Sequence, residues 1–422
     1  MSAFELSVLF FLQATIILAG CRALAALGKR LGQPRVVSEM IAGVVLGPSL
    51  LGLLAPQVPL LPGVWTPLFP RESMPVLYTF AQVGLAVYMF LIGSEFDVGL
   101  IQKRVRSAAA VSVAGIATPF ALGAGLALVL LDDRMFTEGV APVEAMLFLG
   151  ASMSITAFPM LASIIHDRGL SGTSLGTLAL AAGSIDDAAA WCVLAIVLAS
   201  FAGDASIAGI AIGGGACYVA FCLLVVRPLL APLGRRVERA GTMSEGTLGL
   251  VLALVMLGAW ATDYIGIYAV FGAFIMGICM PRGVFTHELH RLLMPTTTAL
   301  LLPMFFVYSG LNTRIGLVST PALWMIAAAV LLAATLGKGI ACYAAARLCG
   351  EPRRDAAAIG SLMNARGLME LIILNIGLER GIITPTLFSI MVIMAIVTTL
   401  VATPAFNLTR RGLPPPAHEP SR

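Results

Sequence analysis

The sequence predicts an all-α polytopic membrane protein of about 13 transmembrane helices, with two five-helix repeats inverted relative to each other. Three observations lead to this prediction. Of the 422 residues, 59% are hydrophobic and only 11% are charged, whereas soluble domains carry about 25% charged residues. Apolar runs long enough to cross a bilayer recur along the chain. Two of these runs are interrupted by similar motifs in corresponding places.

Proline, glycine and charged residues divide the apolar runs into predicted spans. We expect residues 1–409 to form a single transmembrane transporter unit, with core and dimerisation domains interleaved, and residues 410–422 to form a short cytoplasmic tail. The approximate limits of the thirteen spans are 5–28, 36–53, 75–94, 105–131, 143–165, 172–200, 206–232, 246–262, 266–281, 292–310, 321–347, 354–378 and 384–409.

The basic residues support this division of the chain. Of the 26 Lys and Arg residues, 19 lie in odd-numbered connectors or the C-terminal tail, and only 4 lie in even-numbered connectors. Because basic loops stay on the cytoplasmic side, the pattern predicts an outside N-terminus and a cytoplasmic C-terminus in the cell (inner) membrane. The other three basic residues, Arg22, Lys338 and Arg366, fall within spans.

The fifth and twelfth spans are interrupted alike. The fifth contains Ser-Ile-Thr-Ala-Phe-Pro at 154–159, and the twelfth contains Met-Asn-Ala-Arg-Gly at 363–367. Each motif has a polar residue, an Ala, a bulky residue and a helix breaker. Pro159 removes a backbone donor and is expected to kink its helix, while Gly367 tolerates irregular dihedral angles.

Interrupted helices in corresponding halves indicate a transport site at an inverted-repeat interface. The five spans within 36–200 would then correspond to the five within 266–409. The alternative is that Pro and Gly are simply frequent in membrane helices. It explains one break better than two breaks at the same place in a five-span unit.

Two adjacent carboxylates, Asp186 and Asp187, lie near the middle of the sixth span. Each charged side chain at a helix centre costs roughly 2.5–3.5 kcal/mol on insertion scales, so the pair indicates a function. Neighbours on a helix point in different directions. One carboxylate can therefore pair with a cation while the other faces the break in the fifth span.

Lys338, well inside the eleventh span, is the obvious cation for this pair. A proton and a metal ion can then compete for the remaining carboxylate, and competition for one site is all that exchange requires. The alternative is a purely structural ion pair between two helices. It would leave the second carboxylate unexplained.

Arg366 and Glu370 are four residues apart in the twelfth span, so we expect them to meet on one helix face. A structural pair that supports the broken helix and a role in ion access both remain open.

Enzyme classes find little support. The sequence has no Gly-rich phosphate loop followed by Lys, no cluster of metal ligands and no nucleophile motif. We therefore expect a protein that is not an enzyme, with no cofactor and no nucleic-acid partner.

Motifs along nearly all of residues 10–406 resemble the monovalent cation:proton antiporter-2 family, which includes Kef-type and plant CHX-type exchangers. The block at 363–371, Met-Asn-Ala-Arg-Gly-Leu-Met-Glu-Leu, is especially similar to the CHX-like branch. The segments that carry the resemblance are 33–39, 46–52, 90–97, 154–159, Asp186-Asp187 with Trp191, 302–311, Lys338 and 363–371.

The resemblance implies a sodium/proton antiporter-like fold in which the two broken helices cross. It also implies a homodimer whose core domain moves against a scaffold in an elevator-like cycle. Asp187 would bind the transported cation and the proton, Asp186 would pair with Lys338, and Thr156 would help to line the ion site. Support for the broken helices would come from Pro159, Asn364, Arg366, Gly367 and Glu370.

The sequence departs from the CHX-like pattern at one position. CHX-like members usually have Asn where this chain has Asp186, and a pair of Asp residues resembles the electrogenic sodium branch instead. The predicted function is secondary active antiport of Na⁺ or K⁺ against protons, with the choice of cation left open. The alternatives are a potassium efflux channel-like protein and an organic-solute/proton exporter of the same fold.

Overall fold

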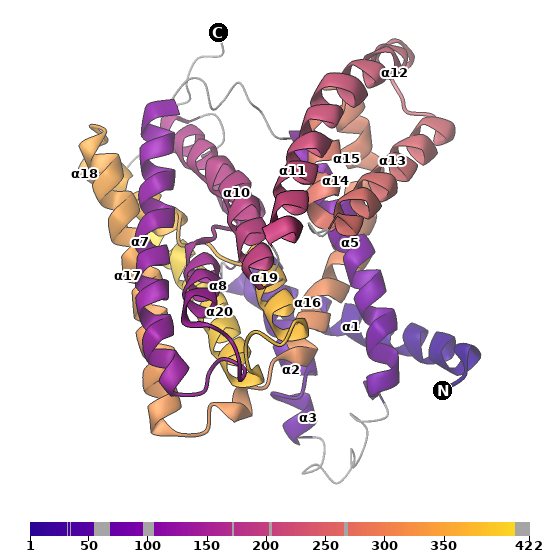
Figure 1. Cartoon of the computed structure of the whole chain (residues 1–422). Helices are drawn as coiled ribbons and strands as arrows, with labels where there is room; N and C mark the ends of the chain where they lie inside the picture. Colours follow the sequence, from indigo (N-terminus) through magenta and orange to yellow (C-terminus); the bar gives the residue numbers. More distant parts are fainter. Residues whose placement is uncertain are drawn as a thin grey trace. The chain divides into compact units, whose positions relative to one another are not determined.

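The protein is helical through the part of the chain that its computed structural model describes (Figure 1). Among those residues, extended backbone is paired only in an isolated β-bridge between Phe136 and Ile383. The all-α prediction is therefore confirmed. The predicted tail 410–422 lies outside the described residues. The structure describes residues 1–31, 33, 35–54, 68–95, 105–170, 173–201, 205–265 and 269–409.

The N-terminal half follows the predicted spans closely. The fifth predicted span is divided into two helices at its motif. The helices are α1 (Ala3–Arg30), α2 (Arg35–Leu46), α3 (Leu51–Leu54), α5 (Met74–Glu95), α7 (Val105–Asp132), α8 (Pro142–Ser154), α9 (Phe158–Asp167) and α10 (Ser174–Phe201).

The C-terminal half repeats this pattern, and its twelfth predicted span is also divided in two. Short π-helical turns at Cys222–Val226 and Thr297–Leu301 join consecutive helices. The helices are α11 (Ala205–Phe221), α12 (Arg227–Ala240), α13 (Glu245–Tyr264), α14 (Ala269–Ile278), α15 (Val284–Thr296), α16 (Leu302–Asn312), α17 (Pro321–Leu348), α18 (Arg353–Leu362), α19 (Leu368–Glu379) and α20 (Pro385–Thr409).

Two predicted boundaries are wrong by about two helical turns. The seventh span was expected to end at 232, but α12 continues to Ala240. The tenth span was expected to begin at 292, but α15 begins at Val284. The charged residues that suggested a connector are accommodated on this helix. Glu288 binds Arg291 at 2.7 Å and accepts a hydrogen bond from the backbone of Met243. Eight helical stretches among the described residues are long and apolar enough to cross a membrane, and the full count of thirteen stays a prediction.

The chain forms two compact units, and each collects segments that are far apart in the sequence. Unit 1 comprises Met1–Cys21, Leu54–Phe96 and Leu198–Tyr308. Unit 2 comprises Arg22–Leu53, Asp97–Val197 and Ser309–Arg422, and it contains both interrupted spans.

Helices in unit 2 approach one another through glycine. α7 packs along both α8 and α17, and α17 packs along α18 (Figure 1). A Cβ added at Gly360 of α18 would lie 2.5 Å from the carbonyl oxygen of Gly339 on α17. A Cβ at Gly310 would lie 2.0 Å from the carbonyl carbon of Gly43 on α2. Small residues at such crossings let membrane helices pack closely where the lipid supplies no hydrophobic driving force.

Helices in unit 1 also approach one another closely at glycine residues. α5 and α14 cross where a Cβ at Gly93 would lie 2.2 Å from the carbonyl oxygen of Phe274, and one at Gly277 would lie 2.1 Å from that of Phe90. α13 and α14 meet at Gly258 and Gly272 in the same way. These contacts hold α5, α13 and α14 together as one compact group.

The two interruptions have the form of extended segments between half-length helices. In the first, α8 ends at Ser154 and α9 begins at Phe158. The sequence predicted that Pro159 would kink a continuous helix, and this prediction is wrong, because the helix is interrupted before Pro159. It is the second residue of α9, where a missing N–H leaves no helical hydrogen bond unmade. In the second, α18 ends at Leu362 and α19 begins at Leu368.

Replacing Gly310 by Ala should destabilise the protein, because the new methyl group would collide with the backbone of Gly43. Overpacking of this kind costs about 1–3 kcal/mol. The measurement is the melting temperature of the purified protein in detergent. Gly316→Ala is the matched control, since a Cβ at Gly316 has open space around it. Equal melting temperatures for the two variants would contradict the close contact.

Candidate functional site

Asp186 lies at the centre of a buried polar cluster in unit 2. It sits near the middle of α10 and is 1% exposed. Its Oδ1 accepts a hydrogen bond from the Ser112 hydroxyl of α7 at 2.5 Å, and its Oδ2 accepts one from the Thr156 hydroxyl at 2.5 Å. The Nζ of Lys338, on α17, lies 3.2 Å from Oδ2. Three donors from three segments thus surround one carboxylate, as a buried charge requires.

Lys338 joins this carboxylate to the end of a broken helix. Its side chain is fully buried, and its Nζ also donates to the carbonyl oxygen of Ser154, the last residue of α8. The last carbonyl groups of a helix have no partner within it and carry partial negative charge. An ammonium group has three donors, so it can serve both the helix end and Asp186.

Arg366 binds the same helix end from the other break. Its Nη2 donates to the carbonyl oxygen of Met153 at 2.7 Å, and its Nη1 lies 3.5 Å from that of Ser152. The guanidinium is fully buried, and its Nη1 lies 3.7 Å from Oε2 of Glu370. The sequence predicted that Arg366 and Glu370 would meet on one helix face. This is wrong, because Arg366 precedes α19, which begins at Leu368. The contact forms across the start of that helix.

The two broken segments cross and are tied together by their backbones. The amide of Ala157 donates to the carbonyl oxygen of Ala365 at 3.1 Å. The Thr399 hydroxyl of α20 then fixes the second segment, because it accepts from the amide of Arg366 at 3.0 Å and donates to its carbonyl oxygen at 2.7 Å. These bonds satisfy backbone groups that the breaks leave unpaired.

The side chains of Asp187 and Pro159 lie outside the described part of the structure. The backbone places Asp187 directly after Asp186 on α10. Successive residues on an α-helix are separated by about 100°, so the two carboxylates project in different directions. The assignment of ion binding to Asp187 stays a prediction.

Asn364 and Glu370 stand apart from the Asp186 carboxylate. The Asn364 amide nitrogen donates to the carbonyl oxygens of Thr335 and Gly360, which ties α18 to α17. Glu370 is fully buried, and neither of its carboxylate oxygens has a hydrogen-bond partner among the described residues. Gly367 is the residue before α19. These positions belong to the second break rather than to the Asp186 cluster.

Sequence reasoning missed Ser112 and the helix-capping contacts of the two cations. Ser112 is a fully buried hydroxyl in the apolar helix α7. A polar side chain in such a place has to find a partner on another helix, and this signal could have singled it out. Which partner it finds depends on how α7 is rotated against α10. Among the described residues, no group of three or more His, Cys, Asp or Glu side chains could hold a metal ion.

Comparison with known proteins gives a consistent match over almost the whole chain. Residues 14–409 match the family model described as sodium/hydrogen exchanger, transmembrane. The Na(+)/H(+) antiporter NhaS4 of Synechocystis sp. is 39% identical over 420 residues, which cover 98% of this chain and 99% of the relative. Cation/H(+) antiporter 19 of Arabidopsis thaliana is 36% identical over 414 residues, which cover 96% of this chain and 50% of the relative.

The fold is also similar to a solved structure. The sodium proton antiporter MjNhaP1 from Methanocaldococcus jannaschii superposes with a TM-score of 0.66 and covers 97% of this chain and 98% of its own. The two sequences are 14% identical. This likeness supports the arrangement of helices, while the matching sequences support the kinship.

Replacing Lys338 by Met should destabilise the protein strongly, because Asp186 would keep a buried charge without its cation and the Ser154 carbonyl would lose its donor. Breaking a buried pair in this way costs about 3–5 kcal/mol. The measurement is thermal unfolding of the purified protein in detergent. The control is Lys29→Met, at an exposed position on α1.

The double variant Lys338→Met with Asp186→Asn separates the pair from its parts. Removing both charges should recover much of the lost stability, because neither partner is then left charged and buried. Strictly additive losses in the two single variants would contradict the pairing.

Proposed function

Because the chain belongs to the sodium/hydrogen exchanger family, we propose that it exchanges a monovalent cation, Na⁺ or K⁺, for protons across a membrane. It is a multi-pass membrane protein. The observation that carries the proposal is the carboxylate of Asp186, held in a buried cluster where two broken helices cross and followed directly by the second carboxylate of Asp187.

Charge balance supports an exchange of ions at this place. Asp186 and Glu370 are matched by Lys338 and Arg366, and all four are buried. Asp187 adds a fifth ionisable group, so an ionised Asp187 gives the set one net negative charge. A charge removed from water requires a counter-charge. A proton and a monovalent cation each supply one positive charge, and they exclude each other.

We assign ion and proton binding to Asp187 and a supporting role to Asp186. Asp186 already binds Ser112, Thr156 and Lys338, so its charge is balanced and three donors occupy most of its roughly four lone-pair sites. Thr156 then contributes to the site through its hydrogen bond to Asp186. Asp187 is the carboxylate whose charge this cluster leaves unbalanced.

The supporting residues hold the two breaks in place around the Asp186 cluster. Arg366 and Lys338 hold the end of α8, Asn364 holds α18 against α17, and Glu370 balances Arg366. Pro159 begins α9 and Gly367 precedes α19. Irregular backbone within a membrane is tolerated where it is buried in protein or lines a cavity. We propose that the extended segments line the ion path.

We further propose that unit 2 is the moving core and unit 1 the dimerisation domain of a homodimer. The support is that unit 2 contains the whole Asp186 cluster and both breaks, while unit 1 is compact by itself. In an elevator-type cycle, the core would carry the loaded site from one side of the membrane to the other. The unequal distribution of Lys and Arg supports an outside N-terminus and a cytoplasmic C-terminus in the cell membrane.

The proposed exchange can be tested in everted membrane vesicles with an acid interior. Addition of Na⁺ or K⁺ should collapse the pH gradient, which a fluorescent dye reports, because the cation enters as protons leave. Asp187→Asn should abolish this response, since an amide cannot bind a proton and a cation in turn. Asp263→Asn, at an exposed position on α13, is the control and should leave the response intact.

Each other outcome counts against a specific part of the proposal. An unchanged response in Asp187→Asn would remove that residue from its role. Cation flux in wild-type vesicles without movement of protons would favour a channel. No response to any monovalent cation from folded protein at several pH values would favour the export of an organic solute.

A further inference from the structure

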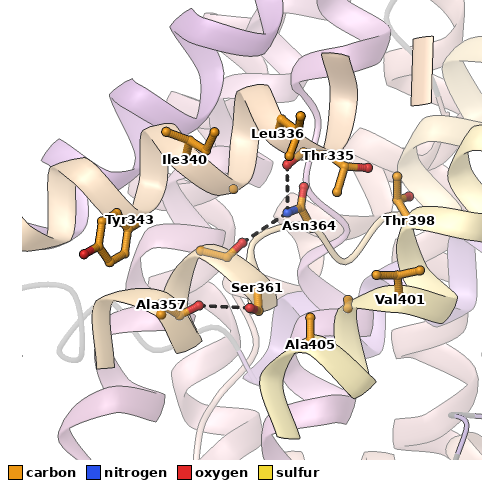
Figure 2. A pocket seen from close by; sticks show the side chains of 13 residues that line it. Thr335, Leu336, Ile340, Tyr343, Ala357, Ser361, Asn364, Thr398, Val401 and Ala405 are labelled. Carbon is orange, nitrogen blue, oxygen red and sulfur yellow. Dashed lines mark hydrogen bonds between the residues drawn. The ribbon is translucent and has the colours of Figure 1, made fainter. Parts of the chain in front are cut away.

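Unit 2 contains a cavity that shares only Asn364 with the residues assigned to the proposed exchange. It lies between α17, α18 and α20 and has a volume of about 310 Å³. Figure 2 shows its lining, which includes Leu336, Ile340, Tyr343, Val401 and Ala405. The volume is near the lower end of the range of about 300–1,000 Å³ for small-molecule sites.

The cavity opens beside side chains that face away from the protein. Leu336 is 51% exposed, Ile340 61% and Val401 46%. α17 and α20 are both long and apolar enough to cross the membrane. Exposed apolar residues on membrane-spanning helices contact lipid chains, so the mouth of the cavity is reached from the bilayer.

A buried amide lines the cavity, together with the hydroxyl-bearing side chains of Thr335, Tyr343, Ser361 and Thr398. The hydroxyls of Ser361 and Thr398 donate to carbonyl oxygens of their own helices. Asn364 is 6% exposed. Its nitrogen donates to the carbonyl oxygens of Thr335 and Gly360, at 3.1 and 3.2 Å, and these are the two dashed lines that meet at Asn364 in Figure 2. Because carbonyl groups only accept, they fix which end of the amide is nitrogen. Its Oδ1 is buried and has no hydrogen-bond partner among the described residues.

We propose that this cavity binds a single-chain membrane lipid that carries a hydroxyl group. The hydrocarbon chain lies against the apolar wall, and the hydroxyl donates its proton to Oδ1 of Asn364. A buried acceptor without a partner costs about 1–3 kcal/mol, and a hydroxyl removes this penalty, whereas a plain hydrocarbon does not. The charge of the transported ion plays no part in this interaction.

The position of the cavity gives such a lipid influence over the second break. Asn364 lies where α18 ends, and Gly339 of α17 lies against Gly360 of α18. Lys338, which holds the end of α8, is the neighbour of Gly339 along α17. A bound lipid would therefore brace the segments that carry the Asp186 cluster, and it should raise the melting temperature of the protein.

The test uses the purified full chain in phospholipid nanodiscs and a diazirine-bearing analogue of 1-decanol as the probe. After illumination, mass spectrometry should locate saturable labelling on α17 and α20 at the cavity. Unlabelled 1-decanol should compete about tenfold more strongly than 1-methoxydecane, because the ether cannot donate a hydrogen bond. 1-Decanol should also raise the melting temperature, while 1-methoxydecane should do so less.

A matched pair of variants locates the site. Ala405→Phe should fill the cavity and abolish saturable labelling. Leu332→Phe, at a 56% exposed position of α17 outside the lining, should label as the wild type does. The proposal is overturned by equal competition from alcohol and ether, or by non-saturable labelling over all exposed apolar positions. If Ala405→Phe fails to fold, the comparison of alcohol with ether in the wild type decides alone.

Discussion

The buried C-terminal end of one half-helix, α8, organises the polar interior of this protein. Its last carbonyl groups, at Ser152, Met153 and Ser154, point into the unit without helical partners, and two buried cations bind them. Lys338 comes from α17 and Arg366 from the break between α18 and α19, so the break in the N-terminal repeat is stabilised by residues of the C-terminal repeat. Each cation is also paired with a carboxylate, Lys338 with Asp186 and Arg366 with Glu370. The cluster of opposite charges follows from the need to satisfy a helix end in a place without water.

This arrangement explains why the two breaks need each other. A helix that ends at the level of a membrane interior exposes backbone groups that lipid cannot satisfy. α8 obtains its donors from α17 and from the second break, and the second break obtains a donor from the amide of Ala157 and a clamp from Thr399. The buried charges therefore have a structural task of their own. Asp186 is held by the structural part of the cluster, and its neighbour on α10 is the residue to which we propose to assign ion binding.

Much of this architecture could be predicted from the sequence. Long apolar runs and the alternation of basic connectors predicted the helices, and the two motifs predicted the breaks. Contacts that depend on helix rotation could not be predicted. Ser112 is one hydroxyl in a long apolar helix, and no local signal says that it faces Asp186. Arg366 and Glu370 were read as neighbours on one helix, whereas the helix begins after Arg366 and its guanidinium turns toward α8.

The hydrogen bond between Ala157 and Ala365 has an evolutionary consequence. It joins the two repeats through a backbone amide and a backbone carbonyl group. Every residue has the carbonyl group, and every residue except proline has the amide N–H. Substitution of side chains in either motif leaves this joint available. Two repeats joined in this way can differ as much as Ser-Ile-Thr-Ala-Phe-Pro and Met-Asn-Ala-Arg-Gly while the hydrogen bond between them is kept. The backbone arrangement of the two repeats can therefore stay similar after their sequences have become different. Each repeat can then carry different charged side chains.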